Sequence, residues 1–209
     1  MSNTPTSADF DSAYENYKAP WVIGEPQSAI VKLEKDGWIR GSVLDVGCGA
    51  GEHTIHLARL GYEALGVDAS IPAIELARAN AERQGVPARF AVADALKPGS
   101  EQYDTVLDSA LFHIFDAADR KKYVDSLRTV CKIDGLVHML ALSDEGPGFG
   151  PEVSDKIIRE AFSSGWHLED LCSAHYVALA TAEHHVTELG LRRGQRVELP
   201  AWQARVRRV

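Results

Sequence analysis

An apolar stretch runs directly into three alternating glycines in the first quarter of this chain. It reads Val43-Leu44-Asp45-Val46-Gly47-Cys48-Gly49-Ala50-Gly51 and is followed by a helical pattern that reaches Leu60. Glycine permits a tight turn and a close approach of the backbone to a ligand, and the helix start adds free N–H groups. A plain strand-to-helix turn rarely needs three such glycines, so the segment predicts a ligand site at a strand end.

The residue after the third glycine restricts the ligand. Position 52 is Glu52, so the G-x-G-x-x-G fingerprint of dinucleotide sites is not met. Asp45 and Glu52 are also unfavourable neighbours for a pyrophosphate, whereas a ligand with a positive centre and an amino group fits them better. A nicotinamide-dependent oxidoreductase is therefore the disfavoured alternative.

The following hundred residues alternate short apolar runs with helical patterns. The apolar runs from Ser42 to Leu142 are VLDV, ALGV, ARFAVA, YDTVLD and LVHMLAL, and we expect helices over residues 72–84 and 117–130 between them. This alternation predicts right-handed crossovers on a mostly parallel sheet with helices on both faces, a Rossmann-like α/β fold. We expect a single domain over residues 1–209, with N-terminal lid helices over 1–40, a cofactor-binding core over 41–145 and a substrate side over 146–209.

Weaker patterns flank that core. Two short helices are expected between Ser12 and Lys35, broken at Pro20, which cannot continue a helix. A helix near 154–163 and strands around 175–179 and 202–206 are expected after it. Three arginines near the end are interpreted as the exposed edge of the last strand; they are Arg205, Arg207 and Arg208.

Composition limits the partners. The chain has 209 residues, is 45% hydrophobic and carries a formal net charge of −8, which disfavours nucleic acid because phosphate binding depends on Lys and Arg. Its cysteines, Cys48, Cys131 and Cys172, show no CxxC spacing, as in a reducing cytosol. No long apolar run or signal-peptide pattern occurs. We therefore expect a cytoplasmic protein with a small-molecule partner, without a membrane partner, and a monomer or a homodimer.

Two acidic residues end the next strands. Asp68 follows the second apolar run about twenty residues after the glycines, where a carboxylate can accept hydrogen bonds from two ribose hydroxyls. Asp94 follows the third run, where it can accept one from an exocyclic adenine amine. The alternatives are a helix cap for Asp68 and a solvated loop for Asp94.

The set of motifs resembles the class I S-adenosylmethionine-dependent methyltransferases. The glycine turn, Asp68, Asp94 and the segment from Asp108 to His113 occur in that family's order and approximate spacing, over roughly half the chain. The resemblance implies a seven-stranded sheet with a reversed last strand and S-adenosylmethionine as cofactor, which leaves as S-adenosylhomocysteine. It also implies a set of cofactor-binding residues: Trp21, Asp45, Gly47, Gly49, Gly51, Asp68, Ala69, Asp94, Ala95, Asp108, Ser109 and His113.

Two further segments suggest a branch of that family. The stretch Ala19-Pro20-Trp21-Val22-Ile23-Gly24-Glu25-Pro26-Gln27 and the stretch Leu111-Phe112-His113 resemble elements of the thiopurine, thiol and halide methyltransferase-like branch. Within it the chain is similar to the heterocyclic toxin methyltransferases, which implies detoxifying methylation at an oxygen, or at a nitrogen or sulfur, of a small heteroaromatic or phenolic compound such as a hydroxyquinolone. Thiol, thiopurine or halide methylation is the alternative, and a noncatalytic S-adenosylmethionine-binding regulator is an alternative of another class. RNA and protein acceptors are disfavoured by the net charge.

Aromatic residues are the candidates for the substrate walls. The branch pattern implies that Trp21 packs on the cofactor and that the N-terminal helices close over the substrate. Phe10, Tyr14, Tyr17, Phe112 and Phe149 are the further candidates. The alternatives are a hydrophobic plug for Trp21 and ordinary amphipathic-helix positions for Phe10, Tyr14 and Tyr17.

His113 is the candidate general base. Imidazole titrates near neutrality, and a hydroxyl acceptor must lose its proton unless it is already ionised. A structural or cofactor-contacting role is the alternative. Asp144 is either a second polar contact or a turn former. The pairs His53 with His56 and His184 with His185 lack acidic or cysteine partners at matching spacing, so no metal is expected.

Overall fold

One seven-stranded sheet carries the fold. The computed structural model describes residues 4–16 and 19–209. Its strands are β1 (Ser42–Val46), β2 (Glu63–Asp68), β3 (Arg89–Val92), β4 (Tyr103–Ser109), β5 (Cys131–Leu142), β6 (Trp166–Leu179) and β7 (Arg196–Arg208). They lie in the order β3-β2-β1-β4-β5-β7-β6. Only β7 runs antiparallel to its neighbours, which confirms the predicted Rossmann-like sheet with a reversed last strand.

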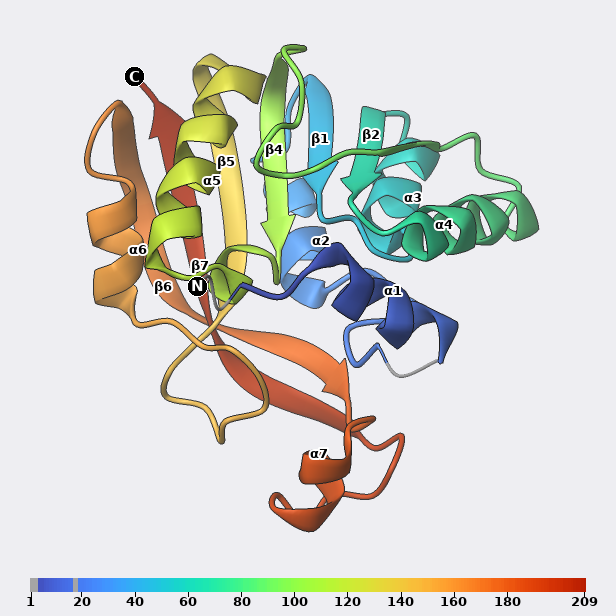
Figure 1. Ribbon diagram of the computed structural model, residues 1–209. Coiled ribbons are helices and arrows are strands. Elements are labelled where there is room, and N and C mark those ends of the chain that lie inside the picture. The colour runs from blue at the N-terminus through green and yellow to red at the C-terminus, as the bar shows by residue number, and fades with distance from the viewer. Residues whose placement is uncertain (1–3, 17–18) are drawn as a thin grey trace.

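Helices cover both faces of this sheet (Figure 1). They are α1 (Ser7–Glu15), α2 (Ser28–Lys35), α3 (Glu52–Arg59), α4 (Ile71–Arg83), η1 (a 3-10 turn, Phe112–Ile114), α5 (Ala117–Val130), α6 (Asp155–Ala161) and α7 (Glu183–Thr187). In the described ranges, no helix is both long and apolar enough to cross a bilayer.

Successive residues of β1 pack on opposite faces, as side chains of a strand do. Leu44 and Val46 lie with side chains of α5 and α6, whereas Val43 lies with those of α2 and α3. Burying each such side chain contributes roughly 1.5–3 kcal/mol. Because both faces are covered, β1 is mostly apolar, with Asp45 as a buried exception, and it holds the glycine turn at the carboxyl end of a central strand.

The first and last parts of the chain meet beyond the carboxyl ends of the central strands. In Figure 1, α1 lies below the ends of β2 and β4, and the β6–β7 hairpin extends past the sheet to α7. The backbone N–H of Leu179 in β6 donates to the carbonyl oxygen of Pro20 at 2.8 Å. The segment before α2 is therefore attached to the hairpin.

Several sequence expectations differ from the structure at these ends. The first helix begins at Ser7 rather than near Ser12, because the Asp9 carboxylate accepts hydrogen bonds from the Thr6 N–H and hydroxyl and caps it there. Strands β6 and β7 have 14 and 13 residues, far longer than expected. Helix α7 was not expected at all.

The placement of the three arginines on an exposed edge is wrong. Strand β7 lies between β5 and β6, so it is an interior strand. The Arg205 guanidinium stacks 3.6 Å from the Trp38 ring centroid, and its Nε donates to Glu169 at 3.0 Å. Arg207 donates to the same carboxylate at 2.5 Å. These contacts join β7 to β6 and to Trp38.

Candidate active site

The three glycines of the turn after β1 serve three different purposes. Gly47 lines a cavity and has a left-handed φ of 70°. A Cβ at Gly49 would lie 2.7 Å from the Tyr14 hydroxyl oxygen, so this glycine makes room for the aromatic residues above it. A Cβ at Gly51 would lie 2.8 Å from the Phe90 ring, so the third glycine lets α3 approach β3. Gly51 faces the core and is not brought to the cavity.

Asp45 is also turned away from the cavity. Its carboxylate is almost fully buried and accepts a hydrogen bond from the Thr54 hydroxyl at 2.7 Å. Burial raises the pKa of Asp45 to about 6. The residue ties β1 to α3, and its predicted direct contact with the cofactor is not supported by this geometry.

Asp68 reaches the cavity from the end of β2, next to Ala69, which also lines it. Its two oxygens accept the backbone N–H groups of Gly49 at 3.0 Å and Ser70 at 2.9 Å. Burial raises the pKa of this carboxyl above its ordinary value. Asp68 thus fixes the glycine turn and presents carboxylate oxygens to the same space.

Asp94 and Ala95 line the cavity after β3. Asp94 Oδ1 accepts the Leu96 N–H at 2.8 Å, which closes the loop. The Ala93 N–H donates to the Asp68 carbonyl at 3.0 Å and holds the two acidic positions side by side. Asp94 therefore stabilises its own loop, as the alternative interpretation expected, and it also lines the cavity.

The last two residues of β4, Asp108 and Ser109, differ in their surroundings. Asp108 is fully buried, accepts the Tyr123 hydroxyl at 2.8 Å and caps η1 through the Leu111 N–H at 3.0 Å. It does not line the cavity, so its predicted cofactor contact is not supported. Ser109 does line it, and the Ser109 Oγ is buried with no hydrogen-bond partner among the described residues.

The chain leaves β4 through a strained residue. Ala110 has a φ of 68°, which costs energy in a residue with a side chain. After this left-handed turn, Leu111 and His113 both line the cavity.

His113 is held by one ring nitrogen. Its Nδ1 accepts the backbone N–H of Leu142 at 3.0 Å, and only 7% of the residue is exposed. Burial lowers the pKa of His113 to about 4. A ring whose Nδ1 accepts carries its proton on Nε2, so the geometry contradicts a general base that faces the cavity with a free lone pair.

Phe10, Tyr14 and Trp21 form an aromatic cap over the cavity. The Trp21 Nε1 donates to the Tyr14 hydroxyl at 2.6 Å, and the Phe10 and Trp21 rings meet edge to face at 5.7 Å. Trp21 is therefore both a plug and a wall. Tyr17 lies outside the described residues.

The cap is attached to the core by a residue that sequence reasoning did not single out. The Gln27 side-chain amide pairs with the backbone of Val177, donating from Nε2 at 2.8 Å and accepting at Oε1 at 2.9 Å. The Gln27 backbone N–H donates to His53 Nε2 at 3.2 Å. The Gly24 N–H donates to Glu52 Oε1 at 3.3 Å. Gln27 is the last residue of the Ala19–Gln27 segment, and its place in that segment was the only sequence feature that pointed to it.

Phe149 lines the cavity in one cluster with Tyr176, Leu199 and Leu142. Its ring stacks on His185 with centroids 3.7 Å apart, and His185 Nε2 lies 3.0 Å from the Phe149 carbonyl oxygen. The hairpin around α7 thus supports this wall. Tyr176 and Leu199 lie on β6 and β7 and were not predicted as site residues.

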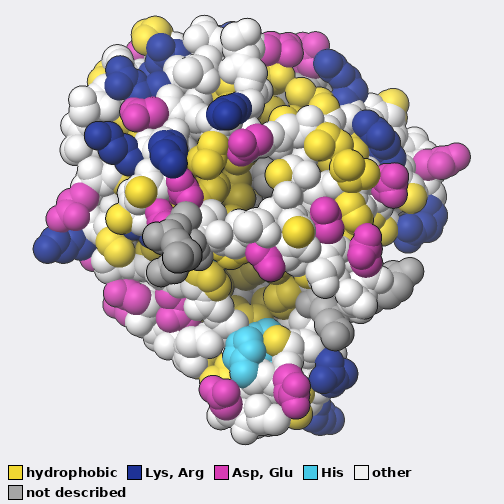
Figure 2. Space-filling view, in the orientation of Figure 1, with side chains coloured by type: hydrophobic (Ala, Val, Ile, Leu, Met, Phe, Trp, Pro, Cys, Tyr) yellow, Lys and Arg dark blue, Asp and Glu magenta, His cyan; other side chains and the backbone are white. Residues whose placement is uncertain are grey.

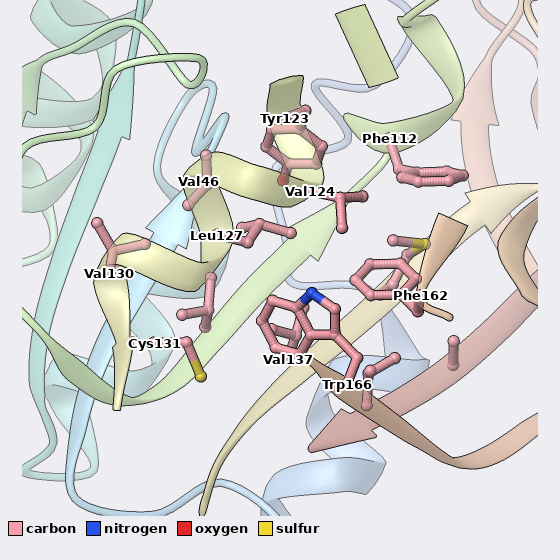
Figure 3. Close-up of a cluster of buried hydrophobic side chains, with 14 of the residues drawn as sticks. Val46, Phe112, Tyr123, Val124, Leu127, Val130, Cys131, Val137, Phe162 and Trp166 are labelled. Atoms are coloured by element: carbon pink, nitrogen blue, oxygen red, sulfur yellow. The ribbon is translucent and has the colours of Figure 1, made fainter. Parts of the chain in front are cut away.

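Phe112 is not brought to the cavity. It is fully buried and stacks on Phe162 at 5.9 Å between centroids. Figure 3 shows it among the core side chains beside Phe162 and Trp166. The prediction of Phe112 as a substrate wall is therefore wrong. In η1 the Phe112 side chain points into the core, and His113, the next residue, lines the cavity instead. Asp144 is exposed and does not line the cavity either.

The cavity itself has a volume of about 640 Å³, within the range of sites for small ligands. Figure 2 shows hydrophobic side chains gathered in the hollowed middle of this face. Among its described lining residues are Asp68 and Asp94 but neither Lys nor Arg. In the described ranges, no group of three His, Cys, Asp or Glu side chains is placed to hold a metal ion.

Comparisons with known proteins agree with this arrangement. Residues 43–135 match the family described as a methyltransferase domain. The chain is 34% identical over 170 residues to the 2-heptyl-1-hydroxyquinolin-4(1H)-one methyltransferase of Mycobacteroides abscessus, which covers 77% of this chain and 74% of that protein.

Two solved structures match nearly the whole chain. One was solved in work on the conversion of a disulfide bond into a thioacetal group during echinomycin biosynthesis; its TM-score is 0.86 at 33% identity, over 97% of this chain and 92% of that one. The other, a SAM-dependent methyltransferase from Anabaena variabilis, has a TM-score of 0.75 at 14% identity over 100% and 98% of the two chains, and it shows the shared fold. This chain belongs to the class I S-adenosylmethionine-dependent methyltransferases.

Proposed function

We propose that this enzyme transfers the methyl group of S-adenosylmethionine to an oxygen of a small, flat heteroaromatic compound such as a hydroxyquinolone. The observation that carries the proposal is one cavity whose described lining joins two carboxylates, after β2 and β3, to aromatic side chains from the cap and from Phe149.

The two carboxylates of the lining fit the cofactor. Asp68 holds carboxylate oxygens where a ribose would lie after β2, and Asp94 does so where an adenine amine would lie after β3. The buried Ser109 hydroxyl lacks a partner among the described residues, so it has hydrogen-bonding capacity for the polar methionine part of the ligand. A lining with carboxylates and without Lys or Arg suits a sulfonium.

The aromatic residues of the lining fit the acceptor. Phe10, Tyr14, Trp21 and Phe149 offer ring faces and edges to the cavity, which suits a flat ring system. When bound, the cofactor supplies an electrophilic methyl group. The protein's own contribution is to orient the acceptor and exclude water, and good orientation can supply roughly 7–11 kcal/mol.

The relative from Mycobacteroides abscessus, which this chain matches over 170 residues, supports a hydroxyquinolone acceptor. A sulfur acceptor is the second candidate, because the structure at 33% identity comes from work on a disulfide substrate. Thiols, thiopurines and halides fall within the same alternative. A regulator that binds S-adenosylmethionine without turnover is the alternative of another class.

The test is mass spectrometry of an acceptor panel incubated with S-adenosylmethionine. The panel contains a hydroxyquinolone, simple phenols, a thiopurine, an alkyl thiol, a cyclic disulfide and iodide. We expect a gain of one methyl on the hydroxyquinolone and none with Asp68→Ala. Methylation confined to the sulfur compounds would favour the second candidate. Binding of S-adenosylhomocysteine without any methylated product would favour the regulator.

A further inference from the structure

We propose that His113 is a hydrogen-bond donor to the acceptor, through Nε2, and that it selects acceptor atoms that are already anionic. The inference rests on the proposed function and deepens it. In this proposal the enzyme does not remove a proton from the acceptor. It recognises an acceptor oxygen that is already ionised.

The tautomer follows from one backbone contact. The Leu142 N–H points at His113 Nδ1 across 3.0 Å, so Nδ1 must offer a lone pair. A neutral imidazole that accepts at Nδ1 carries its hydrogen on Nε2. The opposite tautomer, and the doubly protonated ring, would set two N–H groups against each other in a buried place. The fold therefore fixes Nε2 as a donor.

That donor is available to a ligand. The His113 ring lines the cavity, and among the described residues no hydrogen-bond partner of Nε2 is found. Its neighbours in the wall are Leu142 and Leu111, which offer no competing polar side chain. A hydrogen bond to a charged oxygen in such surroundings is stronger than one to a neutral hydroxyl.

The groups around the ring do not favour proton uptake. Arg120 of α5 is the charged residue whose field acts on His113, and it disfavours the imidazolium. The hydroxyls of Tyr14 and Tyr176 line the same cavity, and burial raises the pKa of each above its ordinary value, so neither ionises readily. Asp68 and Asp94 end β2 and β3, which β1 separates from β4.

With an anionic acceptor the reaction balances without a base. The acceptor oxygen forms a bond to the methyl carbon while the carbon–sulfur bond breaks, and that electron pair stays on sulfur. One negative and one positive charge disappear together, giving a neutral methyl ether and a neutral thioether. No proton has to leave, and the Nε2–H remains where it began.

The charges of the lining narrow the acceptor class further. Among the described lining residues no Lys or Arg is available to pair with a second anionic group, such as a carboxylate. We therefore expect a hydroxylated heteroaromatic compound with an acidic hydroxyl and no other negative charge. An acceptor of that class with an added carboxylate should be a poor substrate.

The first test reads the tautomer without any acceptor. Nitrogen-15 spectra of the imidazole groups, with His113 assigned by its absence in His113→Gln, should show Nε2 protonated and Nδ1 unprotonated from about pH 5.5 to 9. A proton on Nδ1, or titration of the ring near neutrality, would overturn the proposal.

The second test compares two substitutions with a series of phenols and hydroxyquinolones of graded acidity. His113→Gln keeps an N–H near the Nε2 position and should retain most activity, whereas His113→Leu should lower kcat/KM about 10- to 100-fold. A general base would require both variants to be equally inactive. In the wild type, the midpoint of the pH profile should follow the pKa of each acceptor.

The outcomes separate this inference from the proposed function. A midpoint that stays constant across the series, or equal loss in both variants, overturns the donor role while methylation stands. A panel without methylated product overturns the proposed function and the donor role toward substrate with it. Far-UV circular dichroism spectra, which we expect to match the wild type in both variants, exclude misfolding as the cause.

Discussion

The Trp21 indole donates to the Tyr14 hydroxyl across 2.6 Å, directly above the glycine turn. A Cβ on Gly49 would lie 2.7 Å from the same hydroxyl oxygen. The hydrogen bond therefore joins α1 to the segment before α2, and the missing side chain of Gly49 lets this pair lie against the turn after β1. The aromatic cap depends on this joint rather than on the rings alone.

Tyr14→Phe should loosen the cap. The substitution leaves the partly buried Trp21 N–H without its acceptor, which costs about 1–3 kcal/mol. We expect S-adenosylhomocysteine and the acceptor to bind roughly five- to tenfold more weakly in calorimetry. Tyr62→Phe, whose hydroxyl contacts Glu34 away from the cavity, is the matched control. Equal affinities in Tyr14→Phe and wild type would contradict a role for the joint.

Gln27→Ala should destabilise the whole chain. It removes both side-chain hydrogen bonds to Val177 and leaves a buried N–H and a buried carbonyl unpaired. We expect the free energy of unfolding to fall by about 2–4 kcal/mol in urea titrations. Gln84→Ala, at an exposed position, should change it by less than about 0.5 kcal/mol. If the two variants unfold alike, the Gln27 pairing does not hold the cap.

Asp68→Ala should weaken cofactor binding more than it weakens the fold. Both carboxylate oxygens accept backbone N–H groups, and the same side chain lines the cavity. We expect affinity for S-adenosylhomocysteine to fall about 10- to 100-fold, as for lost hydrogen bonds to a charged group. Asp36→Asn, in an exposed pair with Lys32, is the control and should bind normally. Unchanged binding by Asp68→Ala would remove the residue from the proposed site.

Glu52→Gln should stabilise the ligand-free protein at high pH. Burial raises the pKa of Glu52 from 4.5 to about 7, so the folded state holds the proton more tightly than the unfolded chain. The contribution of this group to stability is present below pH 4.5 and is lost as the pH rises through about 7. Glutamine is always neutral and avoids that loss.

Thermal melts therefore should show Tm of Glu52→Gln above wild type at pH 8 and no difference near pH 4.5. Glu188→Gln, at an exposed position after α7, is the control for the loss of one charge. A constant offset at every pH would show that the ionisation of Glu52 is not coupled to folding.

The sheet was predictable from sequence because its signals are local. Runs such as Val43–Val46 and Tyr103–Asp108 are rich in apolar residues, and helical patterns, one of them capped by Asp116, follow along the chain. The β6–β7 hairpin was underestimated because polar residues occupy much of it. Arg205 appeared exposed from its charge, but its stacking on Trp38 depends on a residue far away in the chain.

Most residues predicted for the cofactor and for the substrate line the cavity, but several do not. Asp68, Asp94 and Ser109 follow strand ends, and the edge of a parallel sheet brings such positions together. Asp108 precedes Ser109 by one residue and points the other way, as neighbours in a strand do. The tautomer of His113 depends on a partner 29 residues away, and the pairing of Gln27 on one 150 residues away. No local pattern reports contacts of that kind.

The attachment of Pro20 to Leu179 has a consequence for how new specificities can arise. The aromatic cap and the wall around Phe149 come from segments far apart in the chain that touch each other. In the proposed function these two segments enclose the acceptor, and most of the residues proposed to bind the methyl donor come from the stretch between them. Exchanging both segments together between relatives should therefore transfer the choice of acceptor while the stretch between them stays unchanged. Exchanging either segment alone should disrupt the contact between Pro20 and Leu179.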